Sequence, residues 1–287
     1  MEKHTCQQAA EISGLRQTEI SNFLDISKKA SNLGGEILMK YFGDISSIAS
    51  KGRKGDLVTN ADIESEKEII KYLQKNSPEI GIFAEEGGAQ GHKGSLVWCI
   101  DPLDGTTNYA HGYPFFATSI GLTYKDIPIL GSISIPFLKE HYWAAPGIGS
   151  FCNGRKLNVS SSQKLIDSLL VTGFAYDRFT EQDNNYSEFC WLTHRTRGVR
   201  RGGAAAVDMA FVAAGRVDGY WERGLSKWDL AAGVPLVELA GGSVSDYKGE
   251  LFNLSSGRIL ACNPYIKNEL KSELDKIVPL KEDIYGA

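Results

Sequence analysis

Apolar residues recur at helical spacing in two segments of the first quarter of the chain. The segment from Glu19 to Tyr41 carries them on one face, which predicts a helix that packs on a sheet. The apolar positions of this face are Ile20, Phe23, Leu24, Ile26, Ala30, Leu33, Ile37 and Leu38. A second amphipathic helix is predicted from Asp62 to Lys75, with Asp62 at the position that caps its first turn.

Short apolar runs predict strands in the middle of the chain. Ile80–Ala84 and Val97–Ile100 are runs of this kind, and longer β-rich runs follow at Thr118–Tyr124 and Ile129–Ile135. These later runs are closely spaced and are separated by turn residues. The region from Phe115 to Ala145 is therefore predicted to form an antiparallel meander.

Strands and helices alternate in the rest of the chain. We expect strands at Ser168–Thr172 and Val217–Trp221, and helices at Ala205–Ala214 and Trp228–Ala240. This pattern predicts a mixed α/β (α+β) fold in a single unit, 18–287, with two sheet-centred halves at 18–153 and 154–287. Residues 1–17 lack an apolar core, so we expect a ragged or weakly helical extension rather than a signal peptide.

Composition excludes several classes of protein. The 287 residues are 42% hydrophobic and 23% charged, with a net charge of −4, which gives no general attraction to nucleic acid or anionic membranes. No segment approaches the ~20 apolar residues of a membrane span. The five cysteines are scattered and include no Cys-x-x-Cys pair, which argues against a disulfide framework or a zinc site and favours a reducing cytoplasm.

The segment from Trp98 to Asn108 carries the clearest chemistry. It places Asp101 and Asp104 on either side of a proline, at the expected exit of the strand Val97–Ile100. Gly105 then permits close backbone approach, and the threonines after it suit a helix N-terminus that attracts an anion. Taken alone, this Asp-x-x-Asp pattern is better explained by a turn and a capped helix.

Three more acids change that balance, because each lies at the end of a predicted element. Asp62 begins a helix, Glu85 follows the strand Ile80–Ala84, and Asp229 lies in the first turn of the helix from Trp228. Functional carboxylates are commonly placed on loops held by rigid elements. Oxygen ligands without a His or Cys cluster suit Mg²⁺ or Mn²⁺ rather than zinc.

Four motifs in this order resemble the inositol monophosphatase family. They are Asp56-Leu-Val-Thr-x-x-Asp62, Glu85-Glu86, Trp98-x-Ile-Asp-Pro-Leu-Asp-Gly-Thr-Thr-Asn108 and Trp228-Asp-x-Ala-Ala-Gly233. The resemblance covers nearly the whole chain after about residue 17. It implies a layered α-β-α-β-α sandwich of the inositol monophosphatase and fructose-1,6-bisphosphatase type, with Mg²⁺-dependent, lithium-sensitive phosphatase activity. It also implies a homodimer.

The same resemblance assigns metal ligands. Glu85, Asp101 and the carbonyl oxygen of Leu103 would hold one ion, and Asp101, Asp104 and Asp229 would hold a second. Glu85 would share a third, weaker ion, so two or three Mg²⁺ ions are implied, with Mn²⁺ as a substitute. Two cations bridged by a carboxylate would stabilise the attacking and leaving oxygens of an in-line displacement at phosphorus.

Catalytic and substrate-binding roles follow from the resemblance as well. Thr106, oriented by Asp62, would help Glu85 to activate the attacking water. The first half of the unit is then the metal-binding half and the second the substrate side. The substrate-binding positions implied are Asp104, Gly105, Thr106, Ala205, Glu222 and Lys51.

Three functions follow from these residues. The first is hydrolysis of inositol monophosphate to inositol and phosphate. The second is a related phosphatase acting on fructose 1,6-bisphosphate, histidinol phosphate or a nucleotide such as adenosine 3′,5′-bisphosphate. The third is a regulatory protein that binds RNA or protein, although intact acidic motifs argue against this as the sole function. The basic patch formed by Arg195, Arg197, Arg200 and Arg201 is interpreted as a solvated or subunit-contact strand, an anion contact, or an RNA contact.

Overall fold

The computed structural model describes residues 5–44, 48–50, 57–92 and 94–278, and Lys51 and Asp56 lie outside this part of the chain. Its α-helices are α1 Cys6–Ser13, α2 Gln17–Tyr41, α3 Asn60–Asn76, α4 Thr106–Ala110, α5 Tyr186–Thr193, α6 Ala205–Ala213, α7 Lys227–Leu230, α8 Gly233–Leu239 and α9 Lys267–Leu274. Its strands are β1 Ile48–Ser50, β2 Leu57–Thr59, β3 Gly81–Ala84, β4 Gly88–Gln90, β5 Leu96–Asp104, β6 Ala117–Tyr124, β7 Ile127–Ile135, β8 Glu140–Ala145, β9 Gly149–Cys152, β10 Arg155–Lys156, β11 Leu169–Thr172, β12 Gly198–Arg201, β13 Gly219–Glu222, β14 Ser243–Ser245 and β15 Ile259–Cys262.

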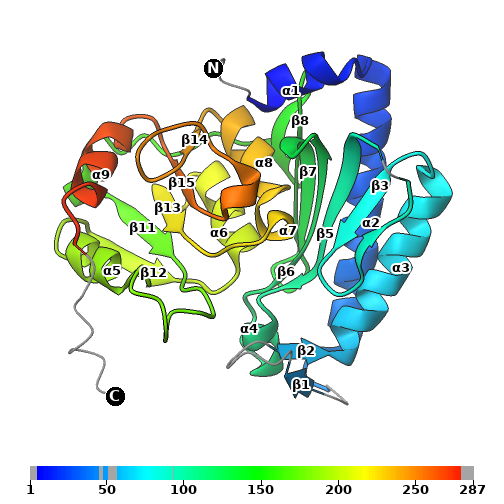
Figure 1. The fold of residues 1–287 in the computed structure, drawn as a ribbon, viewed down its shortest axis with the longest axis horizontal. Coiled ribbons are helices and arrows are strands. Elements are labelled where there is room, and N and C mark those ends of the chain that lie inside the picture. Colours follow the sequence, from blue (N-terminus) through cyan, green and yellow to red (C-terminus); the bar gives the residue numbers. More distant parts are fainter. Residues whose placement is uncertain (1–4, 45–47, 51–56, 93, 279–287) are drawn as a thin grey trace.

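These elements stack in five layers (Figure 1). Helices α2 and α3 cover the outer face of a large sheet, α6 and α8 lie between that sheet and a smaller one, and α5 and α9 lie beyond the smaller sheet. The layered α-β-α-β-α arrangement expected from the sequence is therefore confirmed.

The large sheet contains the predicted meander. Its order among the described residues is β10-β9-β8-β7-β6-β5-β3-β4, and neighbouring strands from β5 to β10 are antiparallel. Strand β3 is the exception, because it runs parallel to β5, with Ala84 opposite Ile100. The sheet continues to Lys156 in β10, which is three residues beyond the boundary expected between the two halves at 153.

The smaller sheet has the order β12-β11-β13-β15-β14. Strand β11 is parallel to both β12 and β13, whereas β15 is antiparallel to its two neighbours. Parallel strands end at the same edge of a sheet, so the connections that follow β12 and β13 start from one edge of the smaller sheet.

Helices α2 and α3 confirm the two amphipathic predictions, each within two residues at either end. Their apolar faces pack on the large sheet, where Phe23 meets the ring of Trp98 edge to face. The buried indole N–H of Trp98 donates to Ser77 Oγ at 2.9 Å, just beyond the end of α3. Because this polar atom is paired, the bulky Trp98 side chain can be wholly buried beneath α2.

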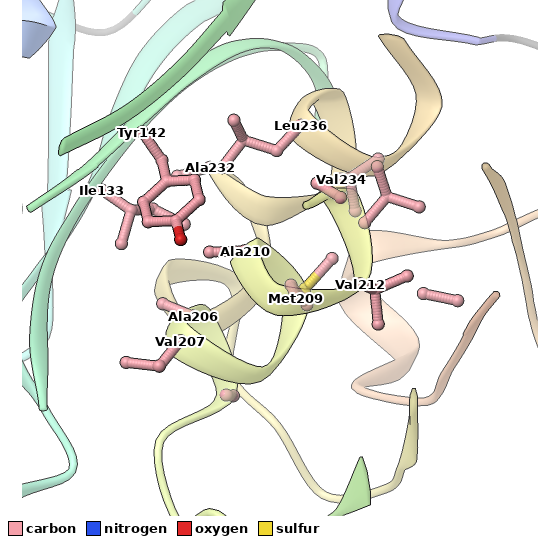
Figure 2. Packing of buried hydrophobic residues seen from close by; sticks show 14 of the residues in the cluster. Ile133, Tyr142, Ala206, Val207, Met209, Ala210, Val212, Ala232, Val234 and Leu236 are labelled. Atoms are coloured by element: carbon pink, nitrogen blue, oxygen red, sulfur yellow. The ribbon is translucent and has the colours of Figure 1, made fainter. Parts of the chain in front are cut away.

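The middle layer joins the two sheets. Figure 2 shows Met209 and Ala210 of α6 packed beside Val234 and Leu236 of α8, with Ile133 and Tyr142 of the large sheet on one side. A single helix over Trp228–Ala240 was expected, and that prediction is wrong, because the segment forms α7 and then α8. Pro235 in the first turn of α8 has no N–H to donate to the preceding turn.

The junction between α7 and α8 lies unusually close to the large sheet. A Cβ atom on Gly121 of β6 would lie 2.6 Å from the carbonyl carbon of Ala231, and one on Gly131 of β7 would lie 2.8 Å from that of Ala232. Only glycine leaves room for the helical backbone at these two neighbouring positions. Glycine in two adjacent strands thus fixes the height of α7 above the sheet.

The N-terminal extension contains a docked helix. Helix α1 begins with a capping box at Thr5, and its residues Cys6, Ala9 and Ala10 are buried. The backbone N–H of Cys6 donates to Glu238 Oε2 of α8 at 2.8 Å. This segment is more ordered than the ragged or weakly helical extension that its composition suggests. None of the helices in the described residues, α2 included, is long and apolar enough to cross a membrane.

Candidate active site

The acids singled out in the sequence converge where the large sheet meets the middle layer. The parallel pairing of β3 and β5 places Glu85 beside Asp101, and the backbone N–H of Glu85 donates to the carbonyl of Ile100 at 3.2 Å. Helix α7 brings Asp229 to the same place from the other half of the chain, since α7 packs on β5 and β6. Four carboxylates from β5, α7 and the end of β3 therefore share one region: Glu85, Asp101, Asp104 and Asp229.

Asp101 lies within a strand rather than at its exit, which corrects the sequence prediction. Strand β5 continues to Asp104, and its register with β6 shifts between Asp101 and Asp104. Pro102 has no N–H for the ladder and occupies this irregularity, as proline in strands generally does. The backbone N–H of Leu103 donates to Asp101 Oδ1 at 3.0 Å, so the bulge turns the carboxylate back along its own strand.

The charge state of Asp101 follows from its surroundings. Its side chain is buried, and burial raises its carboxyl pKa well above the usual value. Repulsion from Glu85, Asp104 and Asp229 raises the pKa further. Burial also raises the pKa of Asp229, again with repulsion from Glu85 and Asp104. Such acids are ionised at neutral pH only when a cation or additional donors compensate their charge.

Asp104 is the acid with the strongest backbone support. Its Oδ1 accepts from the N–H of Ala205 at 3.0 Å, and its Oδ2 accepts from the N–H of Ala206 at 2.8 Å. The residue before α6, Ala204, has no side chain able to cap this helix, so Asp104 caps it from 101 residues away. Burial raises the pKa of Asp104, and these N–H donors oppose that rise.

Asp229 is held by its own helix. A capping box joins it to Ser226, whose backbone N–H donates to Asp229 Oδ2 at 2.7 Å. The position of the helix is in turn fixed by the close approach of Ala231 to Gly121 of β6. The carboxylate therefore belongs to the second half of the chain, but packing on the first sheet determines where it lies.

Thr106 and Asp62 lie within hydrogen-bonding distance. Thr106 Oγ1 is 3.3 Å from Asp62 Oδ1 and 3.0 Å from the carbonyl oxygen of Leu103. The expected capping role of Asp62 is wrong, because Thr59 is the N-cap of α3 and Asp62 is the third helical residue that completes the capping box. Burial raises the pKa of Asp62 to about 6, while hydrogen bonds from Thr59 lower it.

Glu222 ends β13 on the substrate side. Its Oε2 accepts from the hydroxyl of Tyr220 at 2.6 Å, and burial raises its pKa to about 7. Ala205, the other substrate-side position, is buried at the start of α6 and donates its N–H to Asp104. Glu222 and Asp104 repel one another electrostatically, which places both in the same acidic region.

Sequence reasoning missed Asp208. This residue of α6 is 1% exposed, and its Oδ2 has no hydrogen-bond partner among the described residues. Burial raises its pKa well above the usual value, with added repulsion from Glu222 and Asp104. The available signal was a lone carboxylate in the otherwise apolar run Ala205-Ala-Val-Asp-Met-Ala-Phe-Val-Ala213.

The carboxylate oxygens of this region are the type of ligand that a hard divalent cation prefers, although the side chains are not already arranged around an ion. Among the described residues, no three His, Cys, Asp or Glu side chains are arranged so that they would hold a metal ion as they stand. The acids instead pair with each other, since hydrogen bonds link Asp101 with Glu85 and with Asp229. Carboxylates gathered in this way present an excess of oxygen ligands, which is the ligand type preferred by Mg²⁺.

The basic patch separates into different environments. Arg195 pairs with Glu273 at 2.8 Å and stacks on the ring of Trp191, whereas Arg197 pairs with Asp167 at 3.3 Å. The guanidinium of Arg201 lies beside Gly203, where an added Cβ would clash with Nη1, and its charge lowers the pKa of both Asp208 and Glu222. Arg195 and Arg197 are therefore paired with carboxylates away from Arg201.

Comparison with known proteins agrees with the geometry. The model of the inositol monophosphatase family matches residues 19–279. An inositol-1-monophosphatase from Synechocystis sp. is 48% identical over 258 residues, covering 90% of each chain. A protein named Nus factor SuhB from Pseudomonas aeruginosa is 42% identical, covering 84% of this chain and 91% of its own. The solved inositol monophosphatase from Anabaena (Nostoc) sp. superposes with a TM-score of 0.84 at 46% identity, covering 91% of this chain and 98% of its own.

These relatives and the family match identify the chain as a phosphoric monoester hydrolase. The chain belongs to the inositol monophosphatase family, whose members are generally Mg²⁺-dependent.

Proposed function

We propose that this chain hydrolyses inositol monophosphate to inositol and phosphate with two or three Mg²⁺ ions. The observation that carries the proposal is the convergence of buried Asp101 and Asp104 with Asp229 and Glu85 between the two sheets. Their mutual repulsion makes this region a strong attractor for divalent cations. The names of the relatives from Synechocystis and Anabaena support inositol monophosphate as the substrate.

The ligand assignment is the one that the family resemblance implies. Glu85, Asp101 and the carbonyl oxygen of Leu103 would hold one ion, and Asp101, Asp104 and Asp229 would hold another. When bound, the ions would neutralise charge on the attacking and leaving oxygens of the phosphate ester. The bulge in β5 matters here, because it directs the Asp101 carboxylate and the Leu103 carbonyl from one short segment.

Thr106 and Asp62 would orient the attacking water. A hydroxyl that accepts a hydrogen bond from water donates its own proton to another acceptor, and Thr106 Oγ1 has two within reach: the carbonyl oxygen of Leu103 at 3.0 Å and Asp62 Oδ1 at 3.3 Å. With its pKa raised to about 6, Asp62 remains ionised at neutral pH and can accept that hydrogen bond. Glu85, which follows β3 at the same edge of the sheet, would act with Thr106 as the proton acceptor.

The substrate side would recognise hydroxyl groups. The Glu222 carboxylate accepts hydrogen bonds, and adjacent hydroxyls of a polyol are suitable donors. Ala205 is the second substrate-binding position on this side, and the backbone N–H groups of Gly105 and Thr106 would bind the phosphate at the start of α4. Lys51, the remaining expected contact, lies outside the described residues.

A phosphate-release panel tests the substrate. With Mg²⁺, we expect the highest kcat/KM on inositol 1-phosphate, and lower values on fructose 1,6-bisphosphate, histidinol phosphate and adenosine 3′,5′-bisphosphate. A preference for one of the last three would overturn the substrate assignment but keep the enzyme class. Millimolar lithium is expected to inhibit if the second ion site has the form proposed.

Asp101→Asn tests the bridging role. The substitution keeps the acceptor for the Leu103 N–H and removes the charge, so phosphate release should fall below detection while the circular dichroism spectrum is unchanged. Asp25→Asn is the matched control, because Asp25 is exposed on α2 and pairs with the surface residue Lys28 at 3.4 Å. Equal turnover by the Asp101 variant and the control would contradict the assignment of Asp101 as a metal ligand.

We also propose a homodimer in the cytoplasm, as the family resemblance implies. Light scattering after size-exclusion chromatography measures the mass directly, and a mass equal to one chain would contradict the dimer.

A further inference from the structure

The side chain of Asn108 joins the two halves of the site. Asn108 lies on α4, two residues after Thr106, and its Nδ2 is 2.8 Å from the carbonyl oxygen of Phe115. The same Nδ2 is 3.0 Å from the carbonyl of Gly202 and 3.3 Å from that of Gly203, in the connection from β12 to α6. One amide group with two hydrogens thus serves three carbonyls, two of them more than 90 positions away.

The backbones it joins are in direct contact. Gly105 and Gly203 both have positive φ, +88° and +82°. A Cβ on Gly105 would lie 3.0 Å from the carbonyl oxygen of Phe115, 3.1 Å from Ala204 Cβ and 3.3 Å from the carbonyl oxygen of Gly203. The turn proposed to bind phosphate is therefore packed against the connection that begins α6, with no side chain of its own between them.

Asp104 holds the same connection from its other end. It accepts the N–H groups of Ala205 and Ala206, which are the first two residues of α6. Asn108 donates to the carbonyls of Gly202 and Gly203, just before these residues. The start of α6 is therefore held by hydrogen bonds through both its N–H groups and the carbonyls that precede it. Asp104 is a proposed metal ligand, whereas Asn108 is proposed to contact neither a metal nor the substrate and affects the site only by positioning the backbone.

We propose that Asn108 is a positioning residue that sets the separation between the phosphate-binding turn and the polyol-binding side of the site. The inference rests on the proposed function, because it takes Ala205, at the start of α6, as one of the positions on the polyol-binding side. Loss of the Asn108 contacts lets α6 move away from Gly105, which weakens binding of the hydroxyl-bearing part of the substrate. An ester bound through its phosphate alone does not depend on that separation.

The test compares two substrates on two variants. Asn108→Ala removes the donors, and Asn108→Asp also directs a carboxylate at three carbonyl oxygens. We expect KM for inositol 1-phosphate to rise about tenfold in Asn108→Ala, the order expected for lost hydrogen bonds, and further in Asn108→Asp. The KM and kcat for p-nitrophenyl phosphate, which has no polyol hydroxyls, should change less than about threefold. If Asn108→Asp does not fold, Asn108→Ala and the milder Asn108→Ser carry the comparison.

Asn263→Asp is the matched control. Asn263 is fully buried, and its Nδ2 donates to Ser160 Oγ at 2.8 Å and to the carbonyl of Ser162 at 3.3 Å, in the part of the chain around the smaller sheet. The control should lower Tm without changing the ratio of kcat/KM for the two substrates. A positioning role for Asn108 is overturned if its variants change both substrates equally, or neither.

The activity of the wild-type protein on inositol 1-phosphate distinguishes failure of the positioning role from failure of the proposed function. If the wild type does not hydrolyse inositol 1-phosphate, the substrate assignment is wrong, and the ratio is measured instead with the sugar or polyol phosphate that it hydrolyses best. A ratio unchanged by Asn108→Ala with that substrate overturns the positioning role.

Discussion

Gly121 of β6 offers a direct test of how packing places Asp229. In Gly121→Ala, the added Cβ would lie 2.6 Å from both the carbonyl carbon and the Cβ of Ala231, and 2.7 Å from the backbone nitrogen of Ala232. Carbon atoms in proteins pack at about 3.5–4.0 Å, so helix α7 or strand β6 must shift by about 1 Å. The obstacle is largely helical backbone, which cannot rotate out of the way as a side chain would.

The shift has two measurable consequences. Overpacking of this kind costs about 1–3 kcal/mol, which corresponds to a decrease in Tm of several degrees. Asp229 lies only two residues before Ala231, and a displacement of about 1 Å in a catalytic site can lower the rate by about 10²-fold. We therefore expect kcat for phosphate release at 25 °C, where the variant remains folded, to fall by about 10- to 100-fold.

Gly198→Ala in β12 is the control for glycine replacement in a strand. The nearest atom to its added Cβ is Arg200 Nη1 at 3.2 Å, the far end of a flexible side chain, so Tm and kcat should stay near the wild-type values. Tm is measured by differential scanning calorimetry and kcat by phosphate release. Wild-type values of both in Gly121→Ala would refute the argument that glycine fixes the height of α7.

Three other changes test the charged and hydroxyl groups of the site. Burial raises the Glu222 pKa from 4.5 to about 7, so ionisation of this carboxyl destabilises the folded state as pH rises through that interval. With metal removed by EDTA, Glu222→Gln should therefore add up to about 3 kcal/mol to the free energy of unfolding at pH 8.5. At pH 4, where Glu222 is protonated in both states, the substitution should add almost nothing. Urea titrations at both pH values measure this difference, and a gain that is the same at both would contradict it. Thr106→Val should lower kcat by about 10²-fold or more, whereas Thr106→Ser keeps the hydroxyl and most of the activity; equal rates would exclude a role for that hydroxyl. Treatment with EDTA should abolish phosphate release and Mg²⁺ should restore it, and activity that survives dialysis against EDTA would argue against the proposed cofactor.

Local patterns predicted the elements whose structure is decided locally. The apolar face of α2 and the β-rich runs of β6 and β7 lie where periodicity placed them, because each element buries one continuous face. The acid positions at Glu85 and Asp229 were also correctly placed at element ends, since Glu85 follows β3 and Asp229 lies in the single turn of α7.

The wrong predictions concern the ends of helices and strands, where single polar residues or prolines decide the boundary. Thr59 and Asp62 form a capping box, and the sequence Thr-Asn-Ala-Asp contains both partners, so the N-cap is Thr59 and not the predicted Asp62. The break before Pro235 was also visible in the sequence. The continuation of β5 past Pro102 was not, because it depends on pairing with β6 across a bulge.

Tertiary hydrogen bonds lay beyond any local pattern. Asn108 binds carbonyls more than 90 positions away, and Asp104 caps a helix 101 positions away. A residue type indicates which donors it offers but not which partner the fold brings to it. The sequence therefore identified most chemical groups of the site, while the contacts that set their separation required the structure.

The parallel pairing of β3 with β5 also determines which changes in chain length the site can tolerate. Side chains alternate between the two faces of a strand, so one inserted or deleted residue in β3 would turn Glu85 to the face opposite Asp101. Substitutions along these strands can be absorbed by repacking, but a shift of register cannot. Length variation in this region is therefore expected to collect in the connection between β4 and β5, where an insertion leaves the pairing of Ala84 with Ile100 unchanged.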